Sequence, residues 1–143
     1  MATPRLSSIL EQAGDKSSRA DKIEHLRRNA NPALLTILRH THDANIKFAL
    51  PEGIPPYNDF EGLAGEADTR LYQELRKLYL FVEGGHTTLH QLRRETLFIE
   101  LLESIAPEDA KMLLAMKDKK PYPEKKGLTK KLIEEAFPDL IPS

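Results

Sequence analysis

Apolar residues recur every three or four positions along most of this chain, and residues that typically start or stop helices separate the stretches with this pattern. Such spacing puts apolar side chains on one face of an α-helix, whereas a half-buried strand alternates at every second residue. No stretch shows that alternation. The sequence therefore predicts an all-α fold of about seven helices.

Local signals set the expected helix bounds. Asn31 followed by Pro32 is typical of a helix start, and the glycines at 84–85 are typical of a helix end. Thr88 with Gln91 three residues later fits a capping box. We expect helices at residues 5–13, 19–30, 32–41, 68–83, 89–104, from 107 into a lysine-rich stretch, and 129–136.

Two of these helices carry further expectations. The helix at 68–83 is expected to be long, with Leu71, Leu75, Leu78 and Val82 on its buried face. Residues 97–102 are apolar on nearly all sides. A helix of that kind is usually surrounded by protein, so we expect it at the centre of the core.

The chain has 143 residues, a usual size for one domain, so residues 1–143 are expected to form a single compact helical domain. Residues 51–65, with three prolines and three glycines, predict a long crossover loop. Loops this long often have a function. Its apolar side chains either dock a partner protein or fold onto the domain, and both readings stay open: Ile54, Tyr57, Phe60 and Leu63.

Composition excludes several classes. The chain has no cysteine, so it has no disulfide and no thiolate metal site. No apolar run approaches the ~18 residues of a membrane span, and the N-terminus lacks the apolar run of a signal peptide. We therefore expect a soluble protein of the cytoplasm.

Catalytic patterns are not evident. His86 and His90 are four residues apart, as in some metal sites, but no third ligand stands at a matching spacing and no glutamate lies between them. No nucleophile has a recognisable base, and no glycine-rich loop carries the lysine that phosphate binding requires. We expect no enzymatic activity, no metal and no cofactor.

Positive charge is concentrated in one stretch. Residues 111–131 hold eight of the 21 Lys and Arg residues against two acids, a net charge of +6, whereas the whole chain sums to −1. A basic helix end, a proline-rich turn and a new helix opened by Gly127 can form a phosphate-binding corner. The same stretch can also be a solvated loop, and from this segment alone that interpretation is the favoured one.

The order of these features is familiar. A helix with Leu6, Ile9 and Leu10 precedes a polar break and a basic helix; Ile46-Lys47-Phe48 follows the third helix; and the chain ends Ala-Phe-Pro-Asp-Leu-Ile-Pro at 136–142. From about residue 6 to residue 142 the chain resembles the N-terminal, all-helical DNA-binding domain of T-even-type phage ATP-dependent DNA ligases. It is also similar to a group of small proteins of tailed phages, including phages of cyanobacteria.

The resemblance implies a site. In the ligase family this domain holds duplex DNA across the minor groove, through backbone amides and basic residues at helix ends in two corners. One corner would comprise Lys117, Lys119, Lys120, Lys125, Lys126, Gly127, Thr129 and Lys130. The other would comprise Arg39, His42, Asn45 and Lys47.

The resemblance also sets the expected function. The ligase signature Lys-x-Asp-Gly is absent, so ligation is not expected. We expect a non-catalytic module that binds duplex or nicked DNA by its backbone without sequence preference, as a phage accessory protein in the infected host cell. The alternative is a protein–protein adaptor in phage replication, transcription or virion assembly that uses the middle loop.

Overall fold

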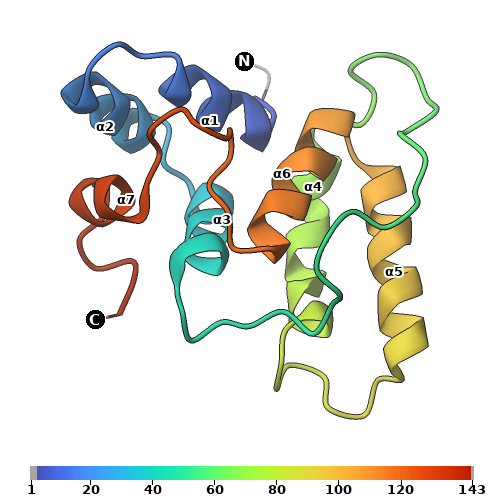
Figure 1. Cartoon of the computed structure of the whole chain (residues 1–143). Coiled ribbons are helices and arrows are strands. Elements are labelled where there is room, and N and C mark those ends of the chain that lie inside the picture. Colours follow the sequence, from blue (N-terminus) through green and yellow to red (C-terminus); the bar gives the residue numbers. More distant parts are fainter. Residues whose placement is uncertain (1–2, 143) are drawn as a thin grey trace.

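Seven α-helices and one 3₁₀ helix follow one another along residues 3–142, the part of the chain that the computed structural model describes (Figure 1). The all-α class is confirmed. The elements are α1 (Leu6–Gly14), α2 (Arg19–Arg28), α3 (Pro32–His42), α4 (Arg70–Glu74), the 3₁₀ helix η1 (Leu75–Phe81), α5 (Gln91–Ser104), α6 (Pro107–Lys117) and α7 (Lys130–Ala136). No helix in this range is long and apolar enough to cross a membrane.

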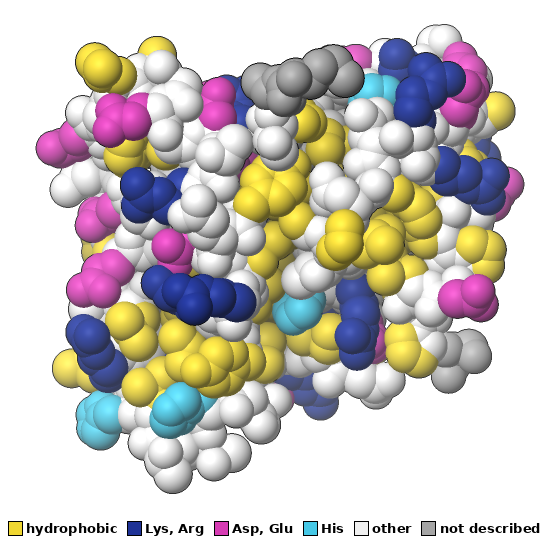
Figure 2. Space-filling model, turned by 180° about the vertical axis from the view of Figure 1, so that it is seen from behind, with side chains coloured by type: hydrophobic (Ala, Val, Ile, Leu, Met, Phe, Trp, Pro, Cys, Tyr) yellow, Lys and Arg dark blue, Asp and Glu magenta, His cyan; other side chains and the backbone are white. Residues whose placement is uncertain are grey.

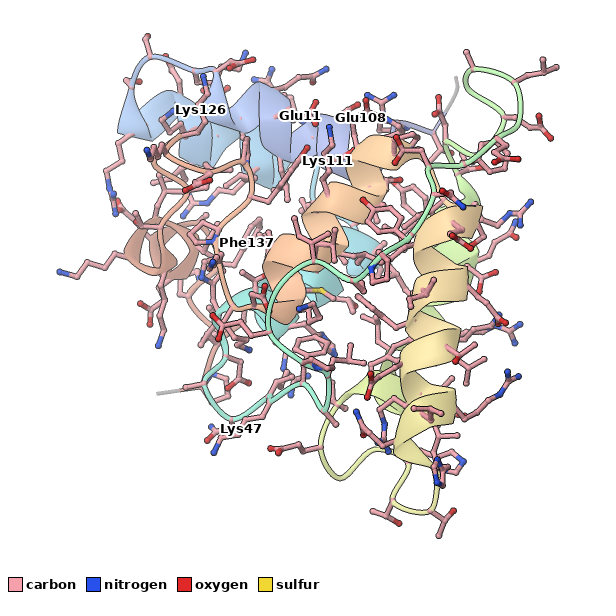
Figure 3. The ribbon with its side chains drawn as sticks, turned by 45° about the vertical axis from the view of Figure 1, so that its right-hand side comes forward. Glu11, Lys47, Glu108, Lys111, Lys126 and Phe137 are labelled. Atoms are coloured by element: carbon pink, nitrogen blue, oxygen red, sulfur yellow. The ribbon has the colours of Figure 1, made fainter. Side chains whose placement is uncertain are left out.

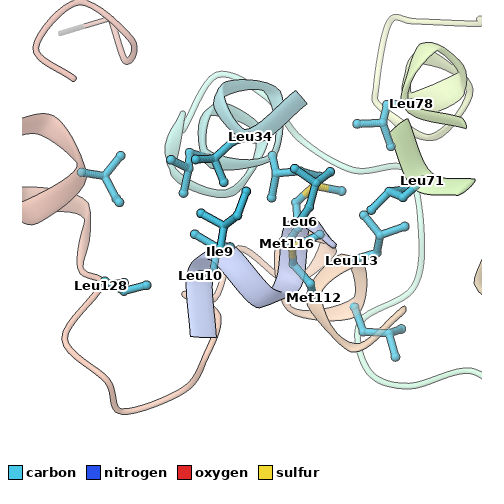
Figure 4. Close-up of a cluster of buried hydrophobic side chains, with 14 of the residues drawn as sticks. Leu6, Ile9, Leu10, Leu34, Leu71, Leu78, Met112, Leu113, Met116 and Leu128 are labelled. Atoms are coloured by element: carbon cyan, nitrogen blue, oxygen red, sulfur yellow. The ribbon is translucent and has the colours of Figure 1, made fainter. Parts of the chain in front are cut away.

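Helix α6 lies at the centre of the molecule. It packs against α1, α3 and α5, and Lys111 is its only exposed residue. Figure 4 shows its side chains converging with those of α1 and α3. The buried apolar residues at this meeting point include Leu6, Ile9, Leu10, Leu34, Met112, Leu113 and Met116.

The prediction that residues 97–102 form the centre of the core is wrong. Helix α5 lies at one edge of the molecule (Figure 1), and it buries one face through Phe98, Leu101 and Leu102. Leu97 and Ile99 are only half-buried, and Glu100 is exposed. The central place belongs to α6, whose apolar residues lie on nearly all sides.

The long helix expected at 68–83 is instead two short elements. Helix α4 ends at Glu74 and the chain continues as η1 to Phe81. From Leu75 onward the inward residues repeat every three positions, at Leu75, Leu78 and Phe81. That period fits a 3₁₀ helix, in which residues three apart are eclipsed. Over so few residues it resembles the α-helical period.

Of the helix starts predicted for α3 and α5, the one at α3 is confirmed and the one at α5 is wrong. Asn31 caps α3 as expected, because its side chain accepts the Leu34 N–H at 2.7 Å. The capping box at Thr88 is wrong. Helix α5 begins two residues later than expected, and the Nδ1 atom of His90 accepts the Leu92 N–H at 3.3 Å.

The two halves of the chain are joined beside the turn that follows α3. Phe48 and Val82 form an isolated antiparallel bridge, flanked by hydrogen bonds of 2.7 Å from Ala49 N–H to Phe81 O and from Glu83 N–H to Lys47 O. Residues 43–69 then connect α3 to α4 without a helix, and the crossover loop expected at 51–65 lies within them.

Basic side chains close several helix ends and loops. Arg27 of α2 donates to the carbonyls of Glu135 and Ala136, each at 2.9 Å, at the end of α7. Buried Arg94 donates to Leu80 O and His86 O and so holds the loop before α5. The last carbonyls of a helix lack intrahelical partners, so such cations stabilise the ends they reach.

Candidate nucleic-acid interface

The segment 118–129, here called the connector, links α6 to α7 and carries many of the predicted site residues. It is folded onto the body of the protein. The Tyr122 hydroxyl donates to the Glu11 carboxylate of α1, and Leu128 is buried in the core. Gly127 adopts φ +80°, which glycine accepts without steric cost. The connector therefore holds its lysines at defined positions.

Lys117 does not point to solvent. Its side chain is 2% exposed, and Nζ donates to Pro51 O and Gly53 O at 2.9 Å each and to the Asp118 carboxylate at 2.6 Å. An ammonium group has three N–H donors, and here all three are used. Lys117 is therefore a structural cation that fixes the start of the crossover loop, and it has no donor for a phosphate.

Lys119 closes the turn after α3. Its Nζ donates to His40 O at 2.5 Å and to Asp43 O and Ile46 O at 2.8 Å each. The same group lies 5.9 Å from the centre of the Phe48 ring, over its face. The pKa of Lys119 is lowered by burial, and the nearby Asp43 offsets only part of that effect. With its donors used internally, Lys119 positions the site without a free N–H.

The other lysines of this region are exposed. Lys126 lies 3.5 Å from the Asp15 carboxylate, and an exposed pair of this kind is weak. On the connector and α7, four exposed lysines form no ion pair with any of residues 3–142 and are free to meet an anion: Lys120, Lys125, Lys130 and Lys131. Lys131 was missed by the sequence reasoning, although it directly follows Lys130.

An open hollow of about 720 Å³ brings the two predicted corners together. It lies between the turn after α3 and the two ends of the connector. Its lining includes His42 and Lys47 from one corner and Lys117, Lys119, Thr129 and Lys130 from the other. Lys126 does not line this hollow, and Figure 3 shows it well apart from Lys47.

The corner at the end of α3 contains an acid that is used internally. Asp43 is 2% exposed, and its carboxylate lies 3.6 Å from Arg39 Nε and accepts the Asn45 N–H at 2.9 Å. Its charge is therefore partly neutralised within the corner. Asn45 and Lys47 are exposed beside it.

His42 adds no positive charge to the hollow at neutral pH. Burial, together with the nearby Lys119 and Lys130, lowers the pKa of His42 from 6.5 to about 4. His42 is therefore a neutral hydrogen-bonding group, and the lysines carry the charge of this surface.

The start of helix α7 is a weaker candidate for anion binding than the sequence predicts. Thr129 caps it, because its hydroxyl oxygen accepts the Leu132 N–H at 3.3 Å. The helix has only seven residues. The dipole of so short a helix is small, and the attraction of this corner for anions rests on side-chain charge.

Charge on the rear of the molecule is mixed. Figure 2 shows Lys and Arg side chains interspersed with Asp and Glu around a central hydrophobic area. No extended area of this face has a single sign.

The four apolar residues of the middle loop do not form one patch. Ile54 and Leu63 are 78% and 80% exposed, whereas Tyr57 and Phe60 are half-buried and Tyr57 packs against the core. Ile54 borders a hollow beside α5, and Leu63 borders a different one near Arg5.

The histidine pair at 86 and 90 has a structural explanation. His86 stacks on Tyr79, with ring centres 6.3 Å apart and planes at 17°, and His90 caps α5. Within residues 3–142, no group of three or more His, Asp or Glu side chains is arranged to hold a metal ion.

The comparison with protein families gives one match. A family model covers residues 9–121, most of the chain. The chain belongs to the family DUF6433. This family is described as one of unknown function, and the matched residues begin within α1, include α2 to α6 and end before Lys125. No curated protein and no solved structure matches the chain.

Proposed function

We propose that this protein is a non-catalytic DNA-binding module that holds duplex or nicked DNA by its phosphate backbone. The observation that carries the proposal is the group of exposed lysines without ion pairs on the connector and α7. They stand in a chain whose remainder is negative. Lys47, across the hollow, adds a fifth free cation: Lys47, Lys120, Lys125, Lys130 and Lys131.

Binding of this kind is expected to be insensitive to sequence. Lysine presents a compact charge on a flexible stem, and contacts to phosphates fix position without reading bases. Lys117 and Lys119 act indirectly, because each holds one border of the hollow through hydrogen bonds to backbone carbonyls.

The likeness to the ligase DNA-binding domain supports the same proposal and adds a cellular setting. We place the protein in the cytoplasm of an infected host cell, as a phage accessory protein. Nicked DNA is included because it is what a ligase domain holds, and intact duplex offers the same phosphates.

The dependence of DNA affinity on salt concentration tests whether the lysines contact phosphates. If each of five lysines meets one phosphate, log K falls against log salt with a slope of about −4 to −5. A fourfold rise in salt then weakens binding by about 300- to 1,000-fold. Fluorescence anisotropy on labelled nicked and intact duplexes measures this slope. Affinity that is flat in salt contradicts the proposal.

A matched pair of variants locates the surface. The first changes Lys125, Lys130 and Lys131 to Glu. The second makes the same charge change on the opposite side of the molecule, at Arg70, Arg76 and Arg93, which are exposed and form no ion pair within residues 3–142.

We expect the lysine variant to lose binding at least a hundredfold more than the arginine variant, since net charge is identical in the two. Circular dichroism and thermal unfolding check that both are folded. Equal losses would mean that binding depends on net charge alone and would refute the proposed surface.

A further inference from the structure

A second hollow, of about 310 Å³, lies between the proline-rich part of the crossover loop and α5. Most of its lining is apolar. The residues around it include Leu50, Pro51, Ile54, Pro55, Pro56, Phe98 and Ile99. We call this surface the loop–α5 groove. It shares only Leu50, Glu52 and Lys117 with the hollow described above.

The walls of the groove are held in place by hydrogen bonds. The buried Lys117 ammonium fixes Pro51 O and Gly53 O, and the Gly53 N–H donates to the Asp118 carboxylate at 3.2 Å. Further along, the Asn58 N–H donates to the Glu103 carboxylate of α5 at 2.8 Å. The loop is thus pre-organised against α5, which lowers the entropy lost when a ligand binds.

Exposed apolar side chains continue the groove. Only four large hydrophobic residues within residues 3–142 are strongly exposed; one of them lines the hollow and a second lies outside the lining, on α5. Ile54, at 78%, borders the hollow itself. Leu92, at 70%, precedes Ile99 by seven residues on α5, so both lie on the same helix face. These two side chains add exposed apolar surface on either side of the hollow.

The rim of the groove is acidic. Glu52 and Glu95 border it, and residues 51–68 contain five acidic residues and no Lys or Arg. The one cation in the lining, Lys117, is already paired with Asp118. The groove therefore repels nucleic acid and favours a positively charged occupant.

We propose that the loop–α5 groove binds a short, basic, amphipathic segment of a partner protein. An apolar side chain of that segment fills the hollow over Phe98 and Ile99, and neighbouring Lys or Arg residues pair with Glu52 and Glu95. Such a segment fits both properties of the groove, whereas a neutral apolar segment fits only one. This inference does not depend on DNA binding.

The test uses a labelled amphipathic helix made of leucine and lysine, and the same peptide with glutamate in every lysine position. Anisotropy with wild-type protein is expected to show binding of the lysine peptide only. Changing Glu52 and Glu95 to Lys is expected to weaken it at least tenfold. The matched control changes Glu83 and Glu134, two exposed glutamates away from the groove, to Lys.

Further measurements test the apolar part of the groove and the identity of its occupant. Replacing Ile54 and Leu92 by Ser tests the apolar part without changing charge and should also weaken binding. Equal loss in the groove variant and the control variant would overturn the proposal, because it would show attraction to net charge. Sedimentation that shows a dimer of wild type, dispersed by the Ile54 and Leu92 substitutions, would also overturn it, because the occupant would then be a second copy.

Discussion

Replacing Lys119 by methionine would remove the ammonium group that closes the turn after α3. This group donates to three backbone carbonyls, at His40, Asp43 and Ile46. Methionine keeps a similar length and volume, so the change tests the charge and the hydrogen bonds more than the packing.

The expected loss can be worked from these contacts. A hydrogen bond to a charged group contributes about 1.5–3 kcal/mol, so three of them set an upper limit of several kcal/mol. Two effects reduce it. Water reaches part of this half-buried site, and the variant no longer buries a charge whose pKa is lowered by desolvation. We expect a net loss of about 3 kcal/mol in the free energy of unfolding.

Urea and thermal unfolding measure this loss, with Lys120→Met as the control. Lys120 is the next residue, is exposed and makes no ion pair within residues 3–142. Its replacement should change stability by less than about 0.5 kcal/mol. For a chain of this size, about 3 kcal/mol lowers Tm by about 10 °C.

A Lys119→Met protein as stable as the Lys120→Met protein would contradict a stabilising role for the Lys119 ammonium group. It would show that the three carbonyls find equivalent partners in water, and that Lys119 is free to serve as a phosphate ligand.

Three other predictions concern single residues. The pKa of His42 is about 4 in the folded protein and 6.5 ordinarily, so the unfolded chain binds more protons than the folded one between these pH values. Wild-type stability should therefore fall by up to about 2 kcal/mol as the pH drops through that window, and His42→Gln should flatten this dependence. Urea unfolding at pH 7 and pH 5 measures the difference. Asp109 accepts the Ser7 N–H at 3.0 Å at the start of α1, and burial raises the pKa of its carboxyl group. At pH 7, Asp109→Asn should therefore keep or slightly raise the free energy of unfolding, because the amide oxygen still accepts this bond and no charge is buried. Asp109→Ala should lower the free energy of unfolding by about 2 kcal/mol, because the acceptor is lost. Gly127→Ala should lower it by about 1 kcal/mol, because φ is +80° while the new methyl group meets only Lys22 Cε at 3.6 Å; no change in Tm would contradict this.

Local chemistry made part of the fold predictable. Asn31 and Pro32 start α3 by interactions within one turn, and the sequence shows them directly. The break at Leu75 was not predictable in this way, because periods of 3.0 and 3.6 residues differ little over seven positions. The central place of α6 depends on three neighbouring helices, so no single stretch of sequence reveals it.

At the candidate site, too, the sequence predicts only part of what the structure shows for the lysines. Their concentration in residues 111–131 was visible, and so was the possibility of an anion-binding corner. The burial of Lys117 and Lys119 was not, because the carbonyls they reach lie 64 to 79 positions away in the chain. Sequence identifies where charge is dense, while the fold decides which charges remain free.

The most direct test of the account is an NMR titration of the isotope-labelled protein with a short nicked duplex, following the backbone amide signals. A DNA-binding surface on the connector predicts shifts at residues 42–47 and at the non-proline residues of 119–131, with little change along α4, η1 and α5. No shifts at low salt, or shifts centred on α5 and the crossover loop, would contradict a DNA-binding surface built on the connector.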